Sequence, residues 1–365
     1  MHVMVRRGGL VIYETLNETG GAMTQVAEMG GEIRVRLTDV AGRIVAVEIV
    51  STRPVEAARM FEEKTADAMC GAIGRVFSLC GNAQTVAALT AVEQALGIAP
   101  DLRVGAAWGA LRRAEILTQV VTRLALHWRR VLELPLAPDA VRAAMAFEQA
   151  IERRALGEDW RRPGAGTPGG GAEIRAPQID IAALIGPIAE ALAARGYEGY
   201  GALPAGMPPE RGVLAAYWDA AAVAKTRARH GAGLAARLAA AEAALRALPG
   251  DIRADLDAAG PSAPRPRERD SGAGEATVDT ARGPLTHRVR IADGVVVGCR
   301  TEAPTEVNFA DRGPVAAGLA GAASDPVAAE LHVLAIDPCV AARVDLAPGR
   351  RARKDGGGRA ASRPS

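Results

Sequence analysis

The chain is rich in apolar residues but very poor in aromatic ones, and this combination limits how it can fold. Of its 365 residues, 49% are hydrophobic and only 3% are aromatic. The core must therefore be built mainly from Ala, Leu, Val and Ile. Such small side chains favour closely packed helices. At roughly 150 residues per domain, the length allows about two domains.

Charge and cysteine content exclude several classes of protein. Lys and Arg number 44 and Asp and Glu 42, a net charge of +2. This is too balanced for binding nucleic acid or an anionic membrane through bulk charge. No apolar stretch approaches the roughly 18 residues of a spanning helix. The four cysteines form no CxxC pair, which argues against a disulfide-rich secreted domain. We therefore expect a cytoplasmic protein with no nucleic-acid partner and no membrane insertion.

Two β-hairpins have clear sequence signals. Residues 31–50 alternate apolar and polar residues around a turn near Asp39 to Gly42. Residues 287–299 place Asp293 and Gly294 between two β-branched runs, which is a strong turn signal.

The remaining segments predict helices and loops. Helical periodicity is found in residues 54–79, 84–96, 105–133, 178–195 and 212–248, the last interrupted near Gly231 and Gly233. Gly- and Pro-rich segments at 161–177 and 260–274 predict loops or linkers within one domain spanning 1–347. The basic tail 348–365 is expected to be disordered.

Two familiar motif types give no functional site. Gly164, Gly166 and Gly169 form a literal GxGxxG, but Pro168 interrupts it and neither a preceding strand nor a following helix is expected. A loop is the better interpretation. The five histidines have no metal-ligand spacing, and we expect each at the surface or at a helix cap.

Two of the cysteines are candidate metal ligands. Cys80 directly precedes an amphipathic helix, where free N–H groups and the helix dipole favour a thiolate. Cys339 follows Asp337 and Pro338, and the aspartate can accept hydrogen bonds that orient neighbouring donors. Cys70 and Cys299 have apolar neighbours and are expected to be structural.

Five segments form an ordered set of motifs. They are residues 31–37 (GEIRVRL), 78–98 (from Ser-Leu-Cys to Ala-Leu-Gly-Ile), 281–287 (ARGPLTH), 304–308 (PTEVN) and 337–339 (DPC). This set resembles the large subunit of nickel-iron hydrogenases, and more closely its non-catalytic relatives, the HupK-type hydrogenase expression and formation proteins. In order, the segments resemble the family's Gly-His-Leu-Arg-Val strand, its first cysteine motif running into Ala-x-Glu-x-Ala-Leu-Gly-Ile, and its Pro-Arg-Gly-x-Leu-x-His, Pro-Thr-x-x-Asn and Asp-Pro-Cys elements.

The departures from the family pattern indicate what the chain has lost. Ala83 and Ala342 stand where the second cysteine of each pair would be, and Ala87 and Asp345 where the two histidines would be. Alanine cannot bridge two metals, so the resemblance implies that no bimetallic hydrogen-splitting site forms and that the protein is not an enzyme. Nickel is not expected. Cleavage of the C-terminal tail, for which the nickel site is the cue in the family, is not expected either.

The resemblance implies an α+β fold, a trimmed nickel-iron hydrogenase large-subunit-like fold with a central helical bundle and peripheral β-hairpins. It also implies a scaffold or chaperone for the iron-cyanide-carbonyl centre. Cys80 and Cys339 would bind the iron transiently, and Arg282 would offset the resulting negative charge, with Ala83 and Ala342 beside the pair. The expected partners are hydrogenase maturation proteins and the immature large subunit. The alternative is a metal-free structural mimic of the large subunit that binds maturation factors.

Overall fold

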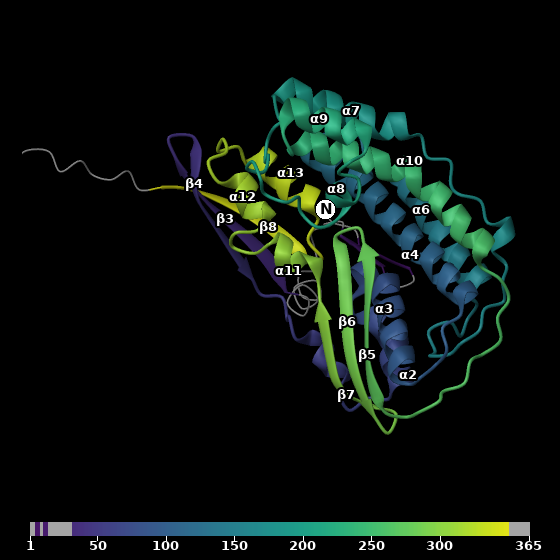
Figure 1. Cartoon of the computed structure of the whole chain (residues 1–365). Helices are drawn as coiled ribbons and strands as arrows, with labels where there is room; N and C mark the ends of the chain where they lie inside the picture. Colours follow the sequence, from purple (N-terminus) through teal and green to yellow (C-terminus); the bar gives the residue numbers. More distant parts are fainter. Residues whose placement is uncertain (1–3, 8–9, 14–30, 350–365) are drawn as a thin grey trace, which may run out of the picture.

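A helical bundle occupies one side of the molecule, and two three-stranded sheets lie beside it (Figure 1). The computed structural model describes residues 4–7, 10–13 and 31–349. A short hairpin of β1 (Met4–Arg7) and β2 (Leu10–Tyr13) precedes these layers. Helices and sheets together give the α+β class expected from the sequence.

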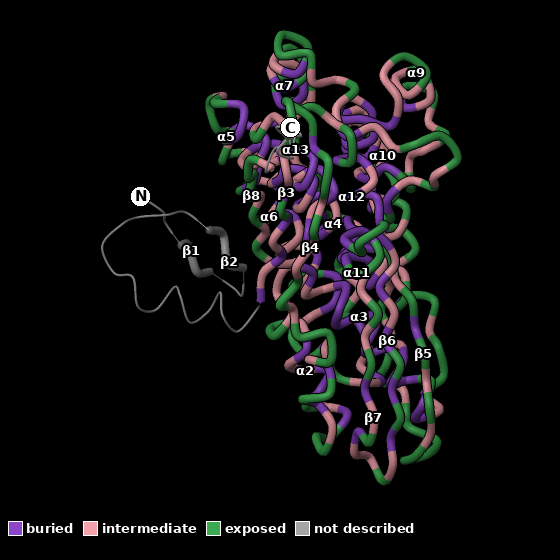
Figure 2. The backbone as a smooth tube through the Cα atoms, turned by 90° about the vertical axis from the view of Figure 1, so that its left-hand side faces the viewer, coloured by how far each residue is buried: buried purple, intermediate pink, exposed green. Residues whose placement is uncertain are grey.

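The bundle is held together by alanine and aliphatic side chains, as the composition predicts. Its long helices pack on one another, α4 contacting both α6 and α10, and α2 contacting α3. Buried segments run along α3 and α4 (Figure 2). The helices of this part are α2 (Ala66–Val76), α3 (Gly81–Ala95), α4 (Leu102–Thr122), α5 (Arg129–Val131), α6 (Pro138–Ile151), α7 (Ile181–Arg195), α8 (Val213–Ala216), α9 (Ala221–His230) and α10 (Leu234–Ala258).

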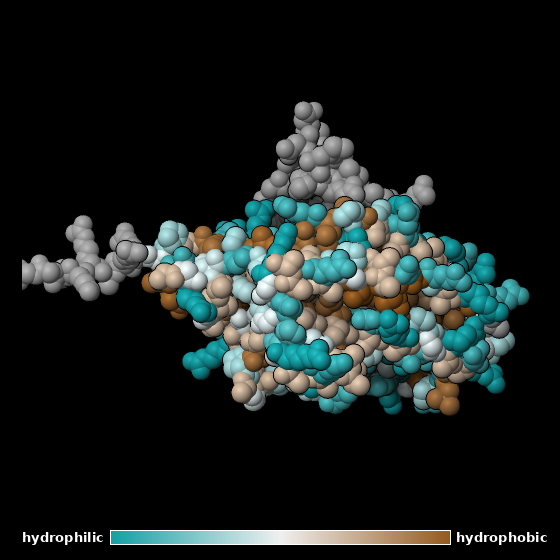
Figure 3. Space-filling model, turned by 90° about the horizontal axis from the view of Figure 1, so that it is seen from above, coloured by the Kyte–Doolittle hydropathy of each residue, from teal (hydrophilic) through white to brown (hydrophobic). Residues whose placement is uncertain are grey.

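Seen from above, strongly hydrophilic side chains are dispersed among mildly apolar ones (Figure 3). Among the described residues, no helix has the length and apolar character needed to cross a bilayer.

Several helix boundaries differ from expectation. The segment 54–79 forms a 3-10 turn (Ala57–Phe61) before α2, and 105–133 is interrupted by a π-helical segment (Arg123–Trp128) between α4 and α5. Helix α6 was not anticipated. The break at Gly231 is confirmed, because its φ of 70° lies in the left-handed region that favours glycine.

The first sheet joins the two ends of the described chain. Its order is β4-β3-β8, with β3 (Glu32–Val40) antiparallel to β4 (Arg43–Ser51) and parallel to β8 (Ala341–Pro348). The first hairpin is thus confirmed, and Ile33, Val35 and Leu37 alternate into the core. Strand β8 was not predicted. Pro348, assigned above to the tail, is its last residue, and the tail from residue 350 lies outside the described residues.

The second sheet has the order β5-β6-β7 and packs on α3. Its hairpin of β6 (Gly283–Ala292) and β7 (Val295–Glu302) confirms the Asp-Gly turn. Strand β5 (Gly272–Thr280) overlaps a segment expected to be a loop. A Cβ on Gly272 or Gly274 would lie 2.2 or 1.9 Å from a backbone oxygen of α3. Glycine therefore marks a close strand–helix approach here, and not a chain break.

The two predicted loops are paired with each other. Thr167 and Ser262 exchange backbone hydrogen bonds of 3.0 and 2.9 Å. The glycines of the GxGxxG contact residues 260–265, and a Cβ on Gly166 would lie 2.0 Å from the Ser262 oxygen. The motif thus serves chain packing, and the loop interpretation is confirmed.

Candidate metal site

Three segments distant in sequence meet at one end of α3. Cys80 ends a 3-10 turn (Ser78–Cys80) directly before α3, and Arg282 lies between β5 and β6. Cys339 lies between α13 (Pro326–Ile336) and β8, after the short helices α11 (Pro304–Asn308) and α12 (Pro314–Leu319). The parallel pairing of β8 with β3 directs the C-terminal segment to this place.

Arg282 holds the Cys339 segment. The residue is 5% exposed, and its guanidinium donates from Nε to the Asp337 carbonyl oxygen at 3.0 Å and lies 3.1 Å from Asp337 Oδ2. Asp337 is two residues before Cys339 and has a left-handed φ of 59°. The backbone oxygen of Asp337 thus accepts the hydrogen bond from Arg282, whereas its carboxylate contributes an ion pair.

Gln119 of α4 connects the same arginine to the Cys80 segment. Its Oε1 accepts from Arg282 Nη1 at 2.8 Å, and its Nε2 donates to the Leu79 carbonyl oxygen at 2.6 Å. Arg282 and Gln119 thus tie the backbones next to both cysteines into one network. Sequence inspection missed Gln119, because nothing along the chain links it to either motif.

The two thiols and the arginine interact electrostatically. Burial works against the charge on Arg282, but Asp337 and the thiols of Cys80 and Cys339 outweigh it and raise the pKa of the guanidinium. The Cys80 thiol likewise interacts with both Arg282 and Cys339. Arg282 therefore lies within electrostatic reach of both thiols, and the use of these three residues as a metal site stays a prediction.

The ionisation expected for Cys80 is wrong. Burial raises the pKa of its thiol to about 12, although Arg282 acts in the opposite direction. The N–H groups at the start of α3 do not reach the sulfur, because those of Asn82 and Ala83 donate to the Glu115 carboxylate at 2.8 and 3.0 Å. Any metal bound here has to displace the thiol proton.

A hydrogen-bonded chain runs from the Cys80 sulfur to β7. Gln84 Nε2 lies 3.6 Å from Cys80 Sγ, and Gln84 Oε1 lies 2.7 Å from His287 Nε2. His287 Nδ1 lies 3.1 Å from the Thr301 hydroxyl. His287 and His332 are fully buried, so the surface position expected for them is wrong. Burial makes the neutral imidazole the stable form and lowers the pKa of both residues.

The residues that stand in place of the missing family ligands lie in different parts of the structure. Ala83 and Ala87 are fully buried in a small apolar cluster with Cys80 and Leu285. Ala342, half-buried on β8, packs instead against the core of the first sheet. Asp345 is exposed on β8, 4.0 Å from Arg34. Strand pairing, which fixes residues 341–348 against β3, accounts for both.

No larger set of candidate ligands is found in the described part of the chain. Among residues 31–349, no group of three or more His, Cys, Asp or Glu side chains is placed to hold a metal. Cys70 and Cys299 are buried in the main core, as expected for structural thiols.

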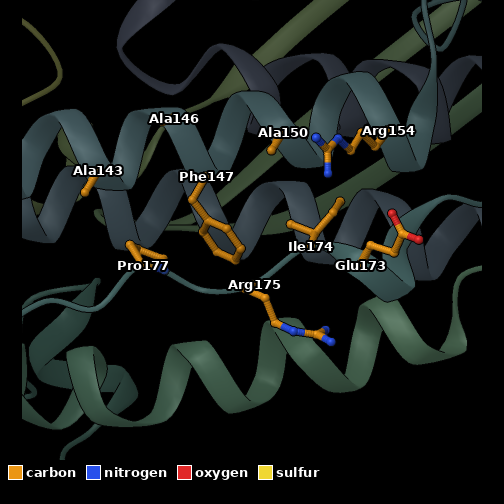
Figure 4. A pocket seen from close by; sticks show the side chains of 9 residues that line it. All are labelled: Ala143, Ala146, Phe147, Ala150, Arg154, Glu173, Ile174, Arg175 and Pro177. Atoms are coloured by element: carbon orange, nitrogen blue, oxygen red, sulfur yellow. The ribbon is translucent and has the colours of Figure 1, made fainter.

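A cavity of about 300 Å³ lies between α6 and residues 173–177, where Phe147, Ile174 and Pro177 line it (Figure 4). None of the three proposed site residues lines it.

Asn308, from the Pro-Thr-x-x-Asn segment, supports the arginine from behind. Its Nδ2 donates to the Arg211 and Arg282 carbonyl oxygens at 2.8 and 3.3 Å. Its Oδ1 accepts from the Arg211 backbone N–H at 2.9 Å. Two of the segments that suggested the family thus meet in space.

Two curated proteins of similar sequence are both hydrogenase expression/formation proteins. A hydrogenase expression/formation protein HupK from Rhizobium leguminosarum bv. viciae is 30% identical, the match covering 87% of this chain and 96% of that protein. A hydrogenase expression/formation protein HupV from Azotobacter chroococcum mcd 1 is also 30% identical, covering 86% and 98%. No protein-family model matches the sequence.

Solved structures of similar fold are nickel-iron-selenium hydrogenases. The enzyme from D. vulgaris Hildenborough matches with a TM-score of 0.58 at 14% identity, covering 83% of this chain and 95% of that chain. The enzyme from Desulfomicrobium baculatum gives 0.59 at 12% identity, with coverage of 83% and 95%. At this identity the likeness concerns the fold alone.

Proposed function

Because this chain belongs to the family of HupK- and HupV-type hydrogenase expression/formation proteins, we propose that it is a non-catalytic accessory protein of nickel-iron hydrogenase maturation. In this role it is a scaffold that holds the iron-cyanide-carbonyl centre, as cargo, during assembly. Its partners are maturation proteins and the immature large subunit.

The observation that carries the proposal is the contact of one buried arginine with both cysteine-bearing segments. Low-spin ferrous iron with cyanide and carbonyl ligands prefers soft thiolates. Iron with two cyanides is neutral, so two thiolates leave about two negative charges on the bound fragment. Arg282 is already placed in the field of both sulfurs and offsets one of these charges.

Two protein ligands suit a carrier better than an enzyme. Fewer ligands hold the fragment less firmly than four, which allows its transfer. Ala83 and Ala87 fill their positions with buried methyl groups and supply no donor for nickel. The same substitutions argue against hydrogen splitting by this chain.

A metal-free mimic of the large subunit that binds maturation factors is the second candidate. The packing of Cys80 among Ala83, Ala87 and Leu285 favours it, because this is also how a structural cysteine is buried. In this case the family fold itself is what partners recognise.

Infrared spectroscopy separates the two candidates. The full chain is purified anaerobically from cells that express the maturation machinery, alongside C80A, C339A and the matched control C70A, whose thiol lies in the main core. The scaffold predicts cyanide and carbonyl stretching bands that are lost in C80A and C339A and retained in C70A. Absence of bands from the intact protein, with maturation proteins still co-purifying, selects the mimic.

A further inference from the structure

A small crevice lies behind the cysteine site, on the far side of Asp337. It has a volume of about 10 Å³, enough for a single water-sized species. Its lining comes from the π-helical segment after α4, from α8 and the residues before it, and from α10 and α13; it includes Arg123, Glu210, Arg211, Leu214, Arg237 and Ile336. Cys80, Cys339 and Arg282 do not line it.

Arg123 is buried at this crevice with part of its guanidinium unused. The residue is 7% exposed; Nη1 donates to the Ala335 carbonyl oxygen at 3.0 Å, whereas Nε and Nη2 have no hydrogen-bond partner. Arg123 is the first residue of the π-helical segment that interrupts the long helix. Such interruptions redirect side chains and are frequent at functional sites.

The carboxylates near Arg123 already form ion pairs with other arginines. Asp337 Oδ2 lies 3.4 Å from Arg123 Nη2 but 3.1 Å from Arg282, so two guanidinium groups share one oxygen. Both oxygens of Glu210 bind Arg237, at 2.6 and 3.0 Å. Burial lowers the pKa of Arg123, an effect that a nearby anion opposes. Arg211 adds a further positive charge to the lining.

We propose that this crevice binds one small monovalent anion of about halide size, in the place of a single water molecule, held by the unpartnered nitrogens of Arg123. The volume excludes phosphate or a carboxylate metabolite. The anion supplies the negative charge that the shared Asp337 carboxylate does not, and it accepts hydrogen bonds from Arg123.

Chloride is the test ligand, because its size and charge fit the crevice. Thermal unfolding of the full chain is followed while chloride replaces gluconate at constant ionic strength. We expect a saturable rise in Tm of about 2 °C or more. R123M should abolish the rise. R129M should retain it, since Arg129 is an equally buried arginine that binds the Pro135 and Ala183 carbonyl oxygens away from the crevice.

Chloride-35 NMR of the wild-type protein gives an answer that does not depend on folding of the variants. Line broadening by the protein that bromide competes away supports the site. An equal Tm in chloride and gluconate, or broadening that R123M leaves unchanged, overturns the proposal and leaves a water molecule in the crevice. Neither measurement involves iron.

Discussion

At the scale of single residues, the candidate site depends on one arginine that few sequence arguments would place correctly. Resemblance to the Pro-Arg-Gly element singled out Arg282, and Asp337 preceded a candidate cysteine. Gln119 and Arg123 have no such signal, because their roles arise from the packing of α4 against the turn before α3 and of the π-helical segment against α13. Motifs can identify ligands, whereas the residues that position them emerge only when helices pack.

Removing the Arg282 guanidinium should destabilise the fold strongly. R282M leaves the Gln119 and Asp337 oxygens without their main donor in a buried place, for a loss of about 3–5 kcal/mol in the free energy of unfolding. Urea titration measures it. R246M, which removes an exposed arginine paired with Glu242 on the same helix, should cost less than about 1 kcal/mol. Equal losses for both variants contradict the network.

His287 should make the protein sensitive to acid. Burial lowers its pKa from 6.5 to about 4 in the folded state. Between these values the unfolded chain binds more protons, so stability falls as pH falls through that window. From pH 7 to 5, H287Q should therefore lose about 2 kcal/mol less than wild type.

The pH comparison needs a difference measurement because other buried groups titrate in the same range. His332 acts in the same direction as His287. Burial raises the pKa of Glu115 to about 8 and of Glu148 to about 7. Their contribution is complete below pH 4.5 and is lost as pH rises through these values. H230Q, at the end of α9, is the control, and a pH profile of H287Q parallel to wild type argues against the assignment.

At the scale of elements, the features that could not be predicted from the sequence are those that depend on glycines in close backbone contacts. Both hairpins follow from alternation and turn residues within about 20 positions, so local rules suffice. Strand β5 and the pairing of the two loops depend on glycines that allow close backbone contacts with elements far along the chain. When only the sequence is known, such glycines cannot be told from the glycines of a loop.

The pairing of the two loops should depend on one buried ion pair. Arg265 contacts the Glu93 carboxylate at 2.8 and 2.9 Å, and Glu93 also accepts from the Gly164 N–H at 2.8 Å. R265M leaves Glu93 buried without its cation, at a cost of about 3 kcal/mol. Limited proteolysis should then cut within residues 161–177. The double variant E93Q/R265M should recover part of the stability, and cleavage that is unchanged in R265M refutes this role.

At the scale of the whole molecule, the fold is closed by pairing segments some 300 residues apart. Strand β8 lies parallel to β3, from Glu32 opposite Ala341 to Asp39 opposite Pro348. Its short sequence, AARVDLAP, has no strong strand signal, so its partner determines its structure. Family resemblance supplied the fold that local patterns did not, because it carries information about such distant contacts.

The pairing of β8 with β3 also affects whether the C-terminal segment can be cleaved. By resemblance, cleavage after the terminal metal motif would fall at Asp345, which in this chain lies within β8 and pairs with Arg36. A protease would have to pull a paired strand out of the sheet, and the nickel site that cues cleavage lacks its ligands at Ala83 and Ala342. We expect the chain to keep all residues through Ser365 in maturation-competent cells. Intact-mass spectrometry should give the full 37.7 kDa. A mass lower by residues 346–365, absent from cells that lack the maturation machinery, would show that the segment is processed after all.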